Sequence, residues 1–275
     1  MKAIATIYFF LKECAVLRES WEYYNDIAAR YDYMYEDPYW QLYHKIVSRL
    51  VGDHISSDKT GCDILDLGTG TGRWAICLAE DGHRVTAVDP SCEMLKVAKM
   101  KADIAEVSVD FIRANGEALP CDDQSYDFVL AMGDVLSYSS RPLEVLQEVT
   151  RVLKSGGELL ATVDNAWAFL QDFLSNAEYS MSERLLEEKL IPIGDKKFSS
   201  KSFFTRPYFP GELGKAVEST GLLLNDMAAV VVFYPYNERE LAKNMDKALE
   251  WEYRYCREEE TFARAEHIFF SAKKR

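Results

Sequence analysis

The chain has 275 residues, of which 48% are apolar and 28% are charged, and its formal net charge is -13. This composition is typical of a globular protein and excludes wholesale disorder. The length allows one large domain or two small ones, and no apolar run reaches the ~18 residues that a membrane span requires. Because a negative field repels phosphate backbones, we expect neither a nucleic-acid partner nor a membrane span.

The cysteines and the first residues of the chain give information about the cellular location of the protein. The 6 cysteines form no Cys-x-x-Cys pair, and no histidine lies at zinc-ligand spacing, so we expect reduced thiols, no metal site and a cytoplasmic location. Residues 1–11 resemble the apolar core of a short signal peptide. Because Lys12 and Glu13 end that run early, we expect instead a helix that packs on the body of the protein. Whether residues 1–12 belong to the native folded chain stays open.

Beyond the N-terminus, the sequence predicts strands and helices in alternation. Residues 14–50 have apolar positions every three or four residues, which indicates helix. Strands are expected at 63–67, 84–89, 109–113, 126–132 and 158–163, with helices at 73–80, 90–101 and 142–153. Such alternation indicates parallel pairing through right-handed crossovers. We therefore expect an α/β fold with a doubly wound, mostly parallel, seven-stranded Rossmann-like sheet.

The alternation breaks after residue 164. The remaining sequence predicts a helix over 165–190, a loop over 191–209, a helix from 210, a strand over 222–233, a helix over 237–262 and a strand over 267–271. We interpret 165–209 and 236–262 as insertions after the fifth and sixth strands of one domain that spans 51–275. Residues 1–50 would form an N-terminal helical lid. The insertions are expected beyond the carboxyl ends of the strands, where such folds bind ligands.

A glycine-rich turn between the first strand and its helix is the most informative segment. Gly68, Gly70 and Gly72 permit a sharp turn and a close approach of the backbone to a ligand. Asp89 closes the next strand about 20 residues later, where a carboxylate can accept hydrogen bonds from both ribose hydroxyls of an adenosine. The strand, the turn, the helix and the terminal acid together predict a nucleoside-binding crevice.

The glycine spacing also discriminates between adenosine cofactors. A dinucleotide fingerprint requires a glycine three residues after its second glycine, and here that position is Arg73. Asp66, which precedes the turn, suits a positively charged ligand. S-adenosylmethionine carries an ammonium and a sulfonium but no phosphate. A nicotinamide-dependent oxidoreductase and a non-catalytic S-adenosylmethionine-binding protein remain as alternatives.

Several motifs, in order along the chain, carry a family resemblance. They lie at 66–72, 89, 115–120, 125–129 and 153–157. Together they resemble the motifs of class I S-adenosylmethionine-dependent methyltransferases, most closely the small-molecule branch of the ubiquinone- and menaquinone-biosynthesis type (methyltransferase type 11-like). The resemblance covers 24–164 well and 203–272 loosely. It implies an enzyme that transfers a methyl group from S-adenosyl-L-methionine to a small molecule.

The resemblance implies cofactor contacts at both ends of the ligand. The methionine portion would be wrapped by the turn residues Gly68, Thr69, Gly70 and Gly72, with Asp66 near its ammonium. The adenosine portion would meet Asp89 at the ribose, Pro90 and Met94 beside the adenine, and Asn115, Gly116 and Glu117 at the ring edge. The family often has Asp where Asn115 stands, and an Asn carbonyl can accept the same hydrogen bond. Met132 and Gly133 would lie near the reactive methyl.

The aromatic N-terminal segment resembles the family's lid over the methionine end. A tyrosine beside a sulfonium is stabilised by cation–π attraction of about 1 kcal/mol. We expect Tyr24 and Tyr31 to contact the cofactor and Arg30 to reach the methionine carboxylate. The alternative is an aromatic stripe that only packs against the sheet.

Methyl transfer is an in-line displacement from a good leaving group, so the protein mainly aligns the reactants and excludes water. A general base is needed only if the acceptor must lose a proton. The candidates are Asp134, Tyr138, Glu117 and His267, and none of them is assigned. His267 lies in an apolar run, which favours a structural strand residue. The other histidines, His44, His54 and His83, are interpreted as surface or helix-end residues.

The acceptor is expected to contact the first insertion. Aromatic side chains are frequent there, and the basic residues are Lys196, Lys197, Lys201 and Arg206. This combination favours a flat or apolar acceptor that carries an acidic group, with Asp134 and Arg206 as candidate substrate contacts. The identity of the acceptor, the methylated atom and the choice between a monomer and a homodimer stay open.

Overall fold

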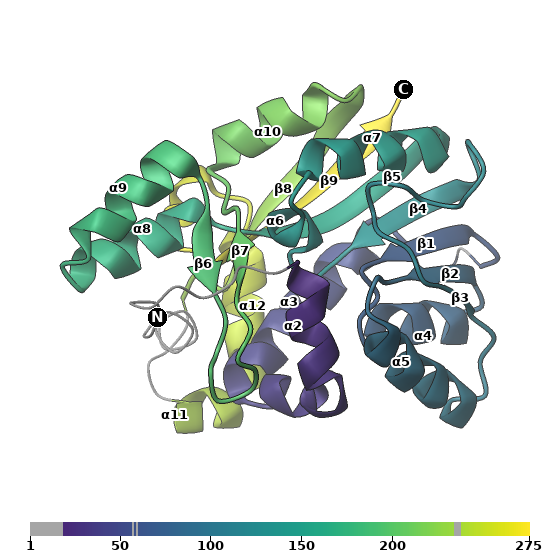
Figure 1. The fold of residues 1–275 in the computed structure, drawn as a ribbon, viewed down its shortest axis with the longest axis horizontal. Helices are drawn as coiled ribbons and strands as arrows, with labels where there is room; N and C mark the ends of the chain where they lie inside the picture. Colours follow the sequence, from purple (N-terminus) through teal and green to yellow (C-terminus); the bar gives the residue numbers. More distant parts are fainter. Residues whose placement is uncertain (1–18, 57, 59, 234–237) are drawn as a thin grey trace.

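The computed structural model describes residues 19–56, 58, 60–233 and 238–275, and its centre is a seven-stranded sheet (Figure 1). The strand order is β3-β2-β1-β4-β5-β9-β8. The strands are β1 Asp63–Leu67, β2 Arg84–Val88, β3 Asp110–Ile112, β4 Tyr126–Ala131, β5 Leu153–Asp164, β8 Leu222–Val230 and β9 His267–Lys274. Strands β1 to β5 pair in parallel, whereas β9 runs antiparallel between β5 and β8. The predicted doubly wound, mostly parallel sheet is therefore confirmed.

The central strands are apolar because both faces of the sheet are covered. Successive residues of a strand point to opposite faces, and the neighbours Ile64 and Leu65 enter two different buried clusters. Both side chains are fully buried. Helices on each side supply the rest of the two cores, which explains why these strands read as continuous apolar runs.

Local sequence features explain where three of the helices around the sheet begin. The helices around the sheet are α4 Arg73–Glu80, α5 Cys92–Ile104, α6 Val135–Tyr138, α7 Pro142–Val152 and α10 Pro210–Glu218. Ser91 caps α5, since its Oγ accepts a hydrogen bond from the backbone N–H of Met94 at 3.2 Å. Helices α7 and α10 each begin with a proline, which the first helical turn tolerates. None of the described helices is both long and apolar enough to cross a membrane.

The N-terminal helix predicted over 14–50 is wrong in detail. Its described part forms α2 Ser20–Ile27, the short 3-10 turns Ala28–Arg30 and Asp32–Tyr35, and α3 Pro38–Gly52. Pro38 disfavours a helical conformation at Asp37, and the Asp37 side chain instead caps α3. The expectations for residues 1–18 lie outside the described residues.

The first insertion, residues 165–209, also differs from its prediction. The single helix splits into α8 Ala166–Ser175 and α9 Tyr179–Glu188, with Ala177 between them at a positive φ of 57°. The predicted loop contains an antiparallel pair, β6 Ile191–Ile193 and β7 Phe203–Thr205. Apolar side chains of the first insertion pack with those of the N-terminal segment in a third buried cluster.

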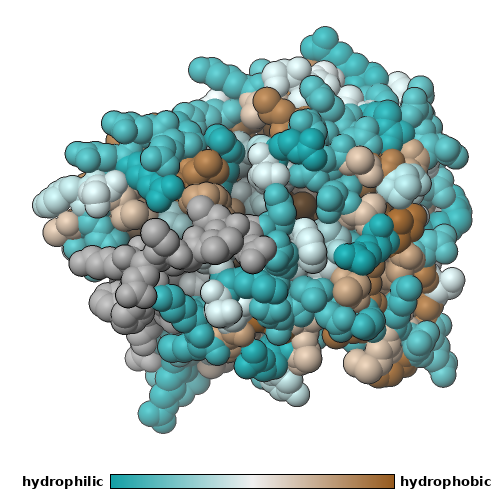
Figure 2. Space-filling view, viewed as in Figure 1, coloured by the Kyte–Doolittle hydropathy of each residue, from teal (hydrophilic) through white to brown (hydrophobic). Residues whose placement is uncertain are grey.

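The second insertion and the end of α7 hold smaller differences. The helix predicted over 237–262 forms α11 Glu238–Lys243 and α12 Met245–Tyr255 in its described part. Strand β5 begins at Leu153, directly after α7, and therefore includes Gly156 and Gly157, which precede the strand predicted over 158–163. The face seen in Figure 2 is mainly hydrophilic, with a small recessed hydrophobic spot near its middle.

Candidate active site

The turn after β1 has a left-handed backbone at each of its three glycines. The φ angles are 70° at Gly68, 55° at Gly70 and 84° at Gly72. A Cβ at Gly68 would lie 2.5 Å from Cγ2 of Val135, and one at Gly72 would lie 3.0 Å from Cβ of Ala98. A Cβ at Gly70 would meet no atom within 4 Å. Packing therefore excludes a side chain at 68 and leaves little room for one at 72, whereas Gly70 borders open space.

Asp89 follows β2 and is fastened to the glycine turn. Its Oδ2 accepts a hydrogen bond from the Gly70 N–H at 2.9 Å, and its Oδ1 accepts one from the Ser91 N–H at 2.8 Å. Burial raises the Asp89 pKa to about 6, against the lowering effect of the two N–H groups. Each carboxylate oxygen has a further lone pair, so a ligand hydroxyl can still donate to it.

Asp66 lies beneath the turn. Its Oδ2 accepts hydrogen bonds from the Thr69 hydroxyl at 2.6 Å and from the Ala75 N–H at 3.0 Å. Burial raises its pKa to about 6. The Asp66 side chain therefore supports the turn from behind, and it is not among the residues that line the adjacent cavities.

A cavity of about 270 Å³ opens at the carboxyl ends of β1, β2 and β4. The predicted cofactor residues that line it are Tyr24, Tyr31, Gly68, Gly70, Asp89, Pro90, Met94, Asn115, Gly116, Glu117, Met132 and Gly133. Trp21, Val135, Tyr138 and Arg141 also line it, although sequence patterns assign them no cofactor role. We call this space the larger cavity.

A smaller cavity of about 90 Å³ adjoins the larger one. The residues common to both cavities are Tyr24, Tyr31, Gly68, Gly70, Met132, Gly133 and Tyr138. Thr69 and Asp134 line the smaller cavity, together with Arg73, Trp74 and His44, which were not predicted there. Burial lowers the His44 pKa to about 4, so this imidazole is neutral at pH 7. The two adjoining spaces suit an elongated ligand.

The N-terminal segment covers both cavities with aromatic rings. The ring centroids of Tyr24 and Tyr31 are 5.9 Å apart, and those of Tyr24 and Tyr138 are 6.1 Å apart. Asp32 accepts a hydrogen bond from the Thr71 hydroxyl at 2.7 Å and pairs with Lys101 at 3.0 Å. The segment is thereby joined to the glycine turn and to α5.

Arg30 and Arg206 lie outside these cavities, as do Asp66 and Gly72. The Arg30 guanidinium donates a hydrogen bond to the Phe198 carbonyl at 2.9 Å. Arg206 lines a separate surface groove with Lys189 and Tyr208. Arg141 lines both this groove and the larger cavity, so the two spaces are neighbours.

Two histidines predicted at surface or helix-end positions are more buried than such positions imply. His83 is buried, and its Nδ1 accepts a hydrogen bond from the Cys62 N–H at 3.3 Å. His54 follows α3, and its largely buried ring lies between Glu158 and Asp226. Contacts with residues distant in sequence bury them, at Cys62 for His83 and at Glu158 and Asp226 for His54, which local polarity does not reveal.

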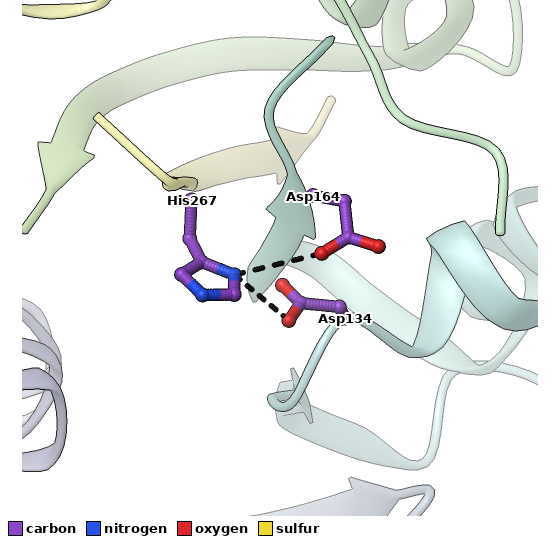
Figure 3. Close-up of side chains that lie close together, drawn as sticks. All are labelled: Asp134, Asp164 and His267. Carbon is purple, nitrogen blue, oxygen red and sulfur yellow. Dashed lines mark ion pairs between the residues drawn. The ribbon is translucent and has the colours of Figure 1, made fainter. Parts of the chain in front are cut away.

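A buried cluster of Asp134, Asp164 and His267 lies where β4 and β5 end and β9 begins (Figure 3). The His267 Nδ1 is 3.0 Å from Oδ2 of Asp134 and 3.7 Å from Oδ1 of Asp164. Burial by itself lowers the His267 pKa, but the two carboxylates outweigh it and raise the pKa to about 9. Burial and the charge of Asp134 raise the Asp164 pKa to about 7.

The sequence identifies Asp134 as a candidate site residue but does not indicate that it lies beside Asp164 and His267. His267 is in a strand, as expected, yet its ring contacts the end of β4. Asp164 is the last residue of β5, and a carboxylate at a strand's carboxyl end was a signal that could have identified it.

Comparisons with known proteins agree with this architecture. Residues 64–157 match the family model described as a methyltransferase domain. The chain is 32% identical over 190 residues to the ubiquinone biosynthesis O-methyltransferase of Aeromonas salmonicida, covering 68% of this chain and 73% of that enzyme. It is 34% identical over 149 residues to the demethylmenaquinone methyltransferase of Lactococcus lactis, covering 50% of this chain and 56% of that enzyme.

Two further relatives widen the comparison. The tRNA 5-carboxymethoxyuridine methyltransferase of Escherichia coli is 28% identical over 215 residues, covering 77% of this chain and 79% of that enzyme. The crystal structure of an S-adenosylmethionine-dependent methyltransferase from Methanosarcina mazei has the same fold, with a TM-score of 0.59, 18% identity and coverage of 78% and 93%. The fold, the glycine turn and these matches show that the chain belongs to the class I S-adenosylmethionine-dependent methyltransferases.

Proposed function

We propose that the protein binds S-adenosylmethionine across the two cavities and transfers its methyl group to a small-molecule acceptor. The observation that carries this proposal is the junction of Gly70 and Asp89 at one cavity wall. The turn backbone and the carboxylate are hydrogen-bonded there, and both line the larger cavity. A nucleoside sugar at that wall could donate hydrogen bonds to Asp89 while the turn stays open to the methionine portion.

The remaining lining supports this orientation. Pro90 and Met94 offer apolar surface for the adenine, and Asn115 to Glu117 offer polar groups for its edge. Tyr24 and Tyr31 border both cavities, where their rings would stabilise a sulfonium through cation–π attraction. Arg73 lines the smaller cavity, where its guanidinium suits the methionine carboxylate.

Charge favours a small-molecule acceptor over RNA. One relative is named as a tRNA methyltransferase, but the net charge of -13 opposes a polyanion. Two other relatives are named for quinone-related substrates. The apolar and aromatic lining beside the proposed methyl position fits a ring compound better than a phosphate backbone.

Calorimetric titration with S-adenosylmethionine, S-adenosylhomocysteine and a nicotinamide dinucleotide tests the cofactor assignment. We expect the first two to bind and the third to show no heat. Replacing Asp89 with Ala should weaken binding by about 1.5–3 kcal/mol, roughly 10- to 100-fold, because a hydrogen bond to a charged group is lost.

A matched control is Asp127→Ala, which removes a carboxylate bonded to Lys154 at 2.9 Å and not among the residues lining either cavity. Equal loss of affinity in both variants would contradict the assignment of Asp89. Binding without methyl transfer to any quinone, phenol or amine offered would favour the non-catalytic alternative.

A further inference from the structure

Three neighbouring strands bring one ligand-bearing residue each to a single point. Asp164 and His267 are directly opposite in the β5–β9 ladder. Asp134 follows β4 in a left-handed conformation, with a φ of 63°. Figure 3 shows the three side chains pointing toward one another, and one ligand atom from each lies within 4.8 Å of the others.

The hydrogen bonding of this cluster is incomplete. Within the described part of the chain, the Asp134 Oδ1 has no hydrogen-bond partner, and the His267 Nδ1 forms ion pairs with Asp134 and Asp164 but no well-aligned hydrogen bond, although both atoms are buried. The two side chains are only 8% and 5% exposed. A single N–H can point at only one acceptor, whereas this nitrogen faces two carboxylates. Unsatisfied buried polar atoms are costly, so the arrangement calls for another group.

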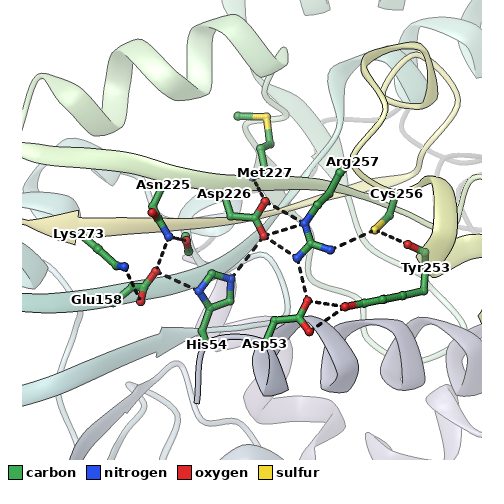
Figure 4. Close-up of polar contacts among 11 residues, drawn as sticks. Asp53, His54, Glu158, Asn225, Asp226, Met227, Tyr253, Cys256, Arg257 and Lys273 are labelled. Carbon is green, nitrogen blue, oxygen red and sulfur yellow. Dashed lines mark hydrogen bonds and ion pairs between the residues drawn. The ribbon is translucent and has the colours of Figure 1, made fainter. Parts of the chain in front are cut away.

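The His54 cluster also places an imidazole between two carboxylates, and its Nε2 likewise has no well-aligned hydrogen-bond partner among the described residues, so the two clusters differ in how their atoms are arranged. His54 uses separate nitrogens, with Nδ1 at 3.0 Å from Glu158 and Nε2 at 3.4 Å from Asp226 (Figure 4). Arg257 and Asn225 also donate hydrogen bonds to those carboxylates. His267 instead presents one nitrogen to both carboxylates, and the ligand atoms converge.

We propose that Asp134, Asp164 and His267 bind a divalent transition-metal ion. Ligand atoms about 2.0–2.2 Å from one ion lie roughly 3 Å apart at right angles, and the observed separation of the His267 Nδ1 from the Asp134 Oδ2 is 3.0 Å. A mixed nitrogen and oxygen set suits Mn²⁺, Fe²⁺, Co²⁺ or Zn²⁺ rather than Ca²⁺, which prefers oxygen alone. Three protein ligands leave coordination positions open.

Supporting hydrogen bonds hold two of the ligands in place. The Thr162 hydroxyl oxygen accepts hydrogen bonds from the N–H groups of Gly133 and Asp134, at 2.9 Å and 3.1 Å. The Thr205 hydroxyl donates to the other oxygen of Asp164. Partners of this kind orient metal ligands in known sites.

The site has a consequence that rests on the proposed function. Asp134 lines the smaller cavity beside Met132 and Gly133, where the methyl group would lie. An ion there could bind an acceptor hydroxyl and lower its pKa, so that its proton passes to water. The oxygen then forms the O–C bond as the C–S bond breaks, which yields the methyl ether and S-adenosylhomocysteine.

Equilibrium dialysis of the chelator-treated full chain against Mn²⁺, read by paramagnetic resonance, tests the site without any acceptor. We expect saturation near one ion per chain. Asp134→Asn, which keeps the shape and removes the charge, should weaken binding at least about 10-fold, the loss already typical of outer-shell partners. His54→Gln, a matched change of an imidazole between two carboxylates, should bind as the unaltered chain does.

Two controls keep the result decisive. Mn²⁺ should raise the melting temperature of the unaltered chain and of His54→Gln but not of Asp134→Asn, whose fold is checked by circular dichroism. Absence of stoichiometric Mn²⁺ binding, or equal binding by Asp134→Asn, overturns the metal site. S-adenosylmethionine is titrated separately. If the chain binds S-adenosylmethionine but not Mn²⁺, the metal site fails and the proposed function stands. If it binds Mn²⁺ but not S-adenosylmethionine, the metal site stands and the proposed function fails.

Discussion

Gly68 and Gly70 have similar backbone angles but different surroundings, and this difference separates stability from binding. The left-handed conformation costs an L-residue roughly 1–2 kcal/mol at either position. A Cβ at Gly68 would also meet Val135 at 2.5 Å, whereas a Cβ at Gly70 would project into the open space that Gly70 lines.

We therefore expect Gly68→Ala to lower the free energy of unfolding by a further 1–3 kcal/mol or so through overpacking. Gly70→Ala should lower the free energy of unfolding less than Gly68→Ala does. It should weaken S-adenosylhomocysteine binding by more than about 10-fold, because the new methyl group occupies ligand space. Urea unfolding without ligand and calorimetry measure the two effects. Identical stability losses with unchanged affinity in Gly70→Ala would contradict the placement of the cofactor.

At the scale of elements, the N-terminal segment is joined to the glycine turn through Asp32. This carboxylate binds Thr71 and Lys101, and its side chain is 42% exposed. Exposed ion pairs contribute about 0–1 kcal/mol, so the contact is more important for holding the segment over the cavities than for stability.

Replacing Asp32 with Asn should therefore speed cofactor dissociation several-fold and change the melting temperature little. The control is Glu93→Gln. This change removes an exposed ion pair between Glu93 and Lys96, both on α5, the helix that also carries Lys101. Stopped-flow dissociation of S-adenosylhomocysteine compares the two variants. Equal rates in both would mean that Asp32 does not hold the segment closed.

The first insertion contributes Arg206 to the groove beside the larger cavity. If an acidic group of the acceptor extends into that groove, Arg206→Ala should raise the KM for the acceptor about 10-fold, by loss of a charged hydrogen bond. The affinity for S-adenosylmethionine should stay unchanged, because Arg206 is not among the residues lining either cavity. Parallel loss of both affinities would exclude a role specific to the acceptor.

At the scale of the whole molecule, the His54 cluster joins the end of α3 to the far part of the sheet. Its ring contacts Glu158 on β5 and Asp226 on β8, and Arg257 bridges Asp226 to Asp53 at 2.7 Å and 2.8 Å (Figure 4). Pairing of the ring N–H groups of His54 with the Asp226 and Glu158 carboxylates raises the His54 pKa to about 9, against the effect of burial.

A raised histidine pKa makes a stability contribution that depends on pH. The contribution is complete below the unfolded value of about 6.5 and is lost as pH rises through about 9. His54→Gln should therefore lose about 1–2 kcal/mol of unfolding free energy at pH 6, after allowance for solvent screening. The difference from the unaltered chain should shrink toward pH 10, and urea unfolding at several pH values measures it. A difference independent of pH would mean that packing, not charge, explains the effect.

The strand–helix alternation and the glycine turn were predictable because local features encode them. A buried parallel strand is a short apolar run, a sharp turn needs glycine, and Asp89 ends the next strand. The structure accordingly places most of the cofactor residues implied by the resemblance around one cavity. The roles of Arg30 and Arg206 were less predictable, because side chains on short turns and inserted loops reach partners distant in sequence.

The sequence by itself therefore determined the sheet, the glycine turn after β1 and the carboxylate of Asp89 at the end of β2. Each of these features is specified within a few residues. Only the tertiary structure brought Asp134, Asp164 and His267 together, because the last strand of the chain lies between β5 and β8. The same holds for the aromatic cover, where contacts with distant residues outweigh the helical pattern of the N-terminal segment. Long-range pairing has no local pattern in the sequence, and for that reason this cluster could be recognised only in the folded chain.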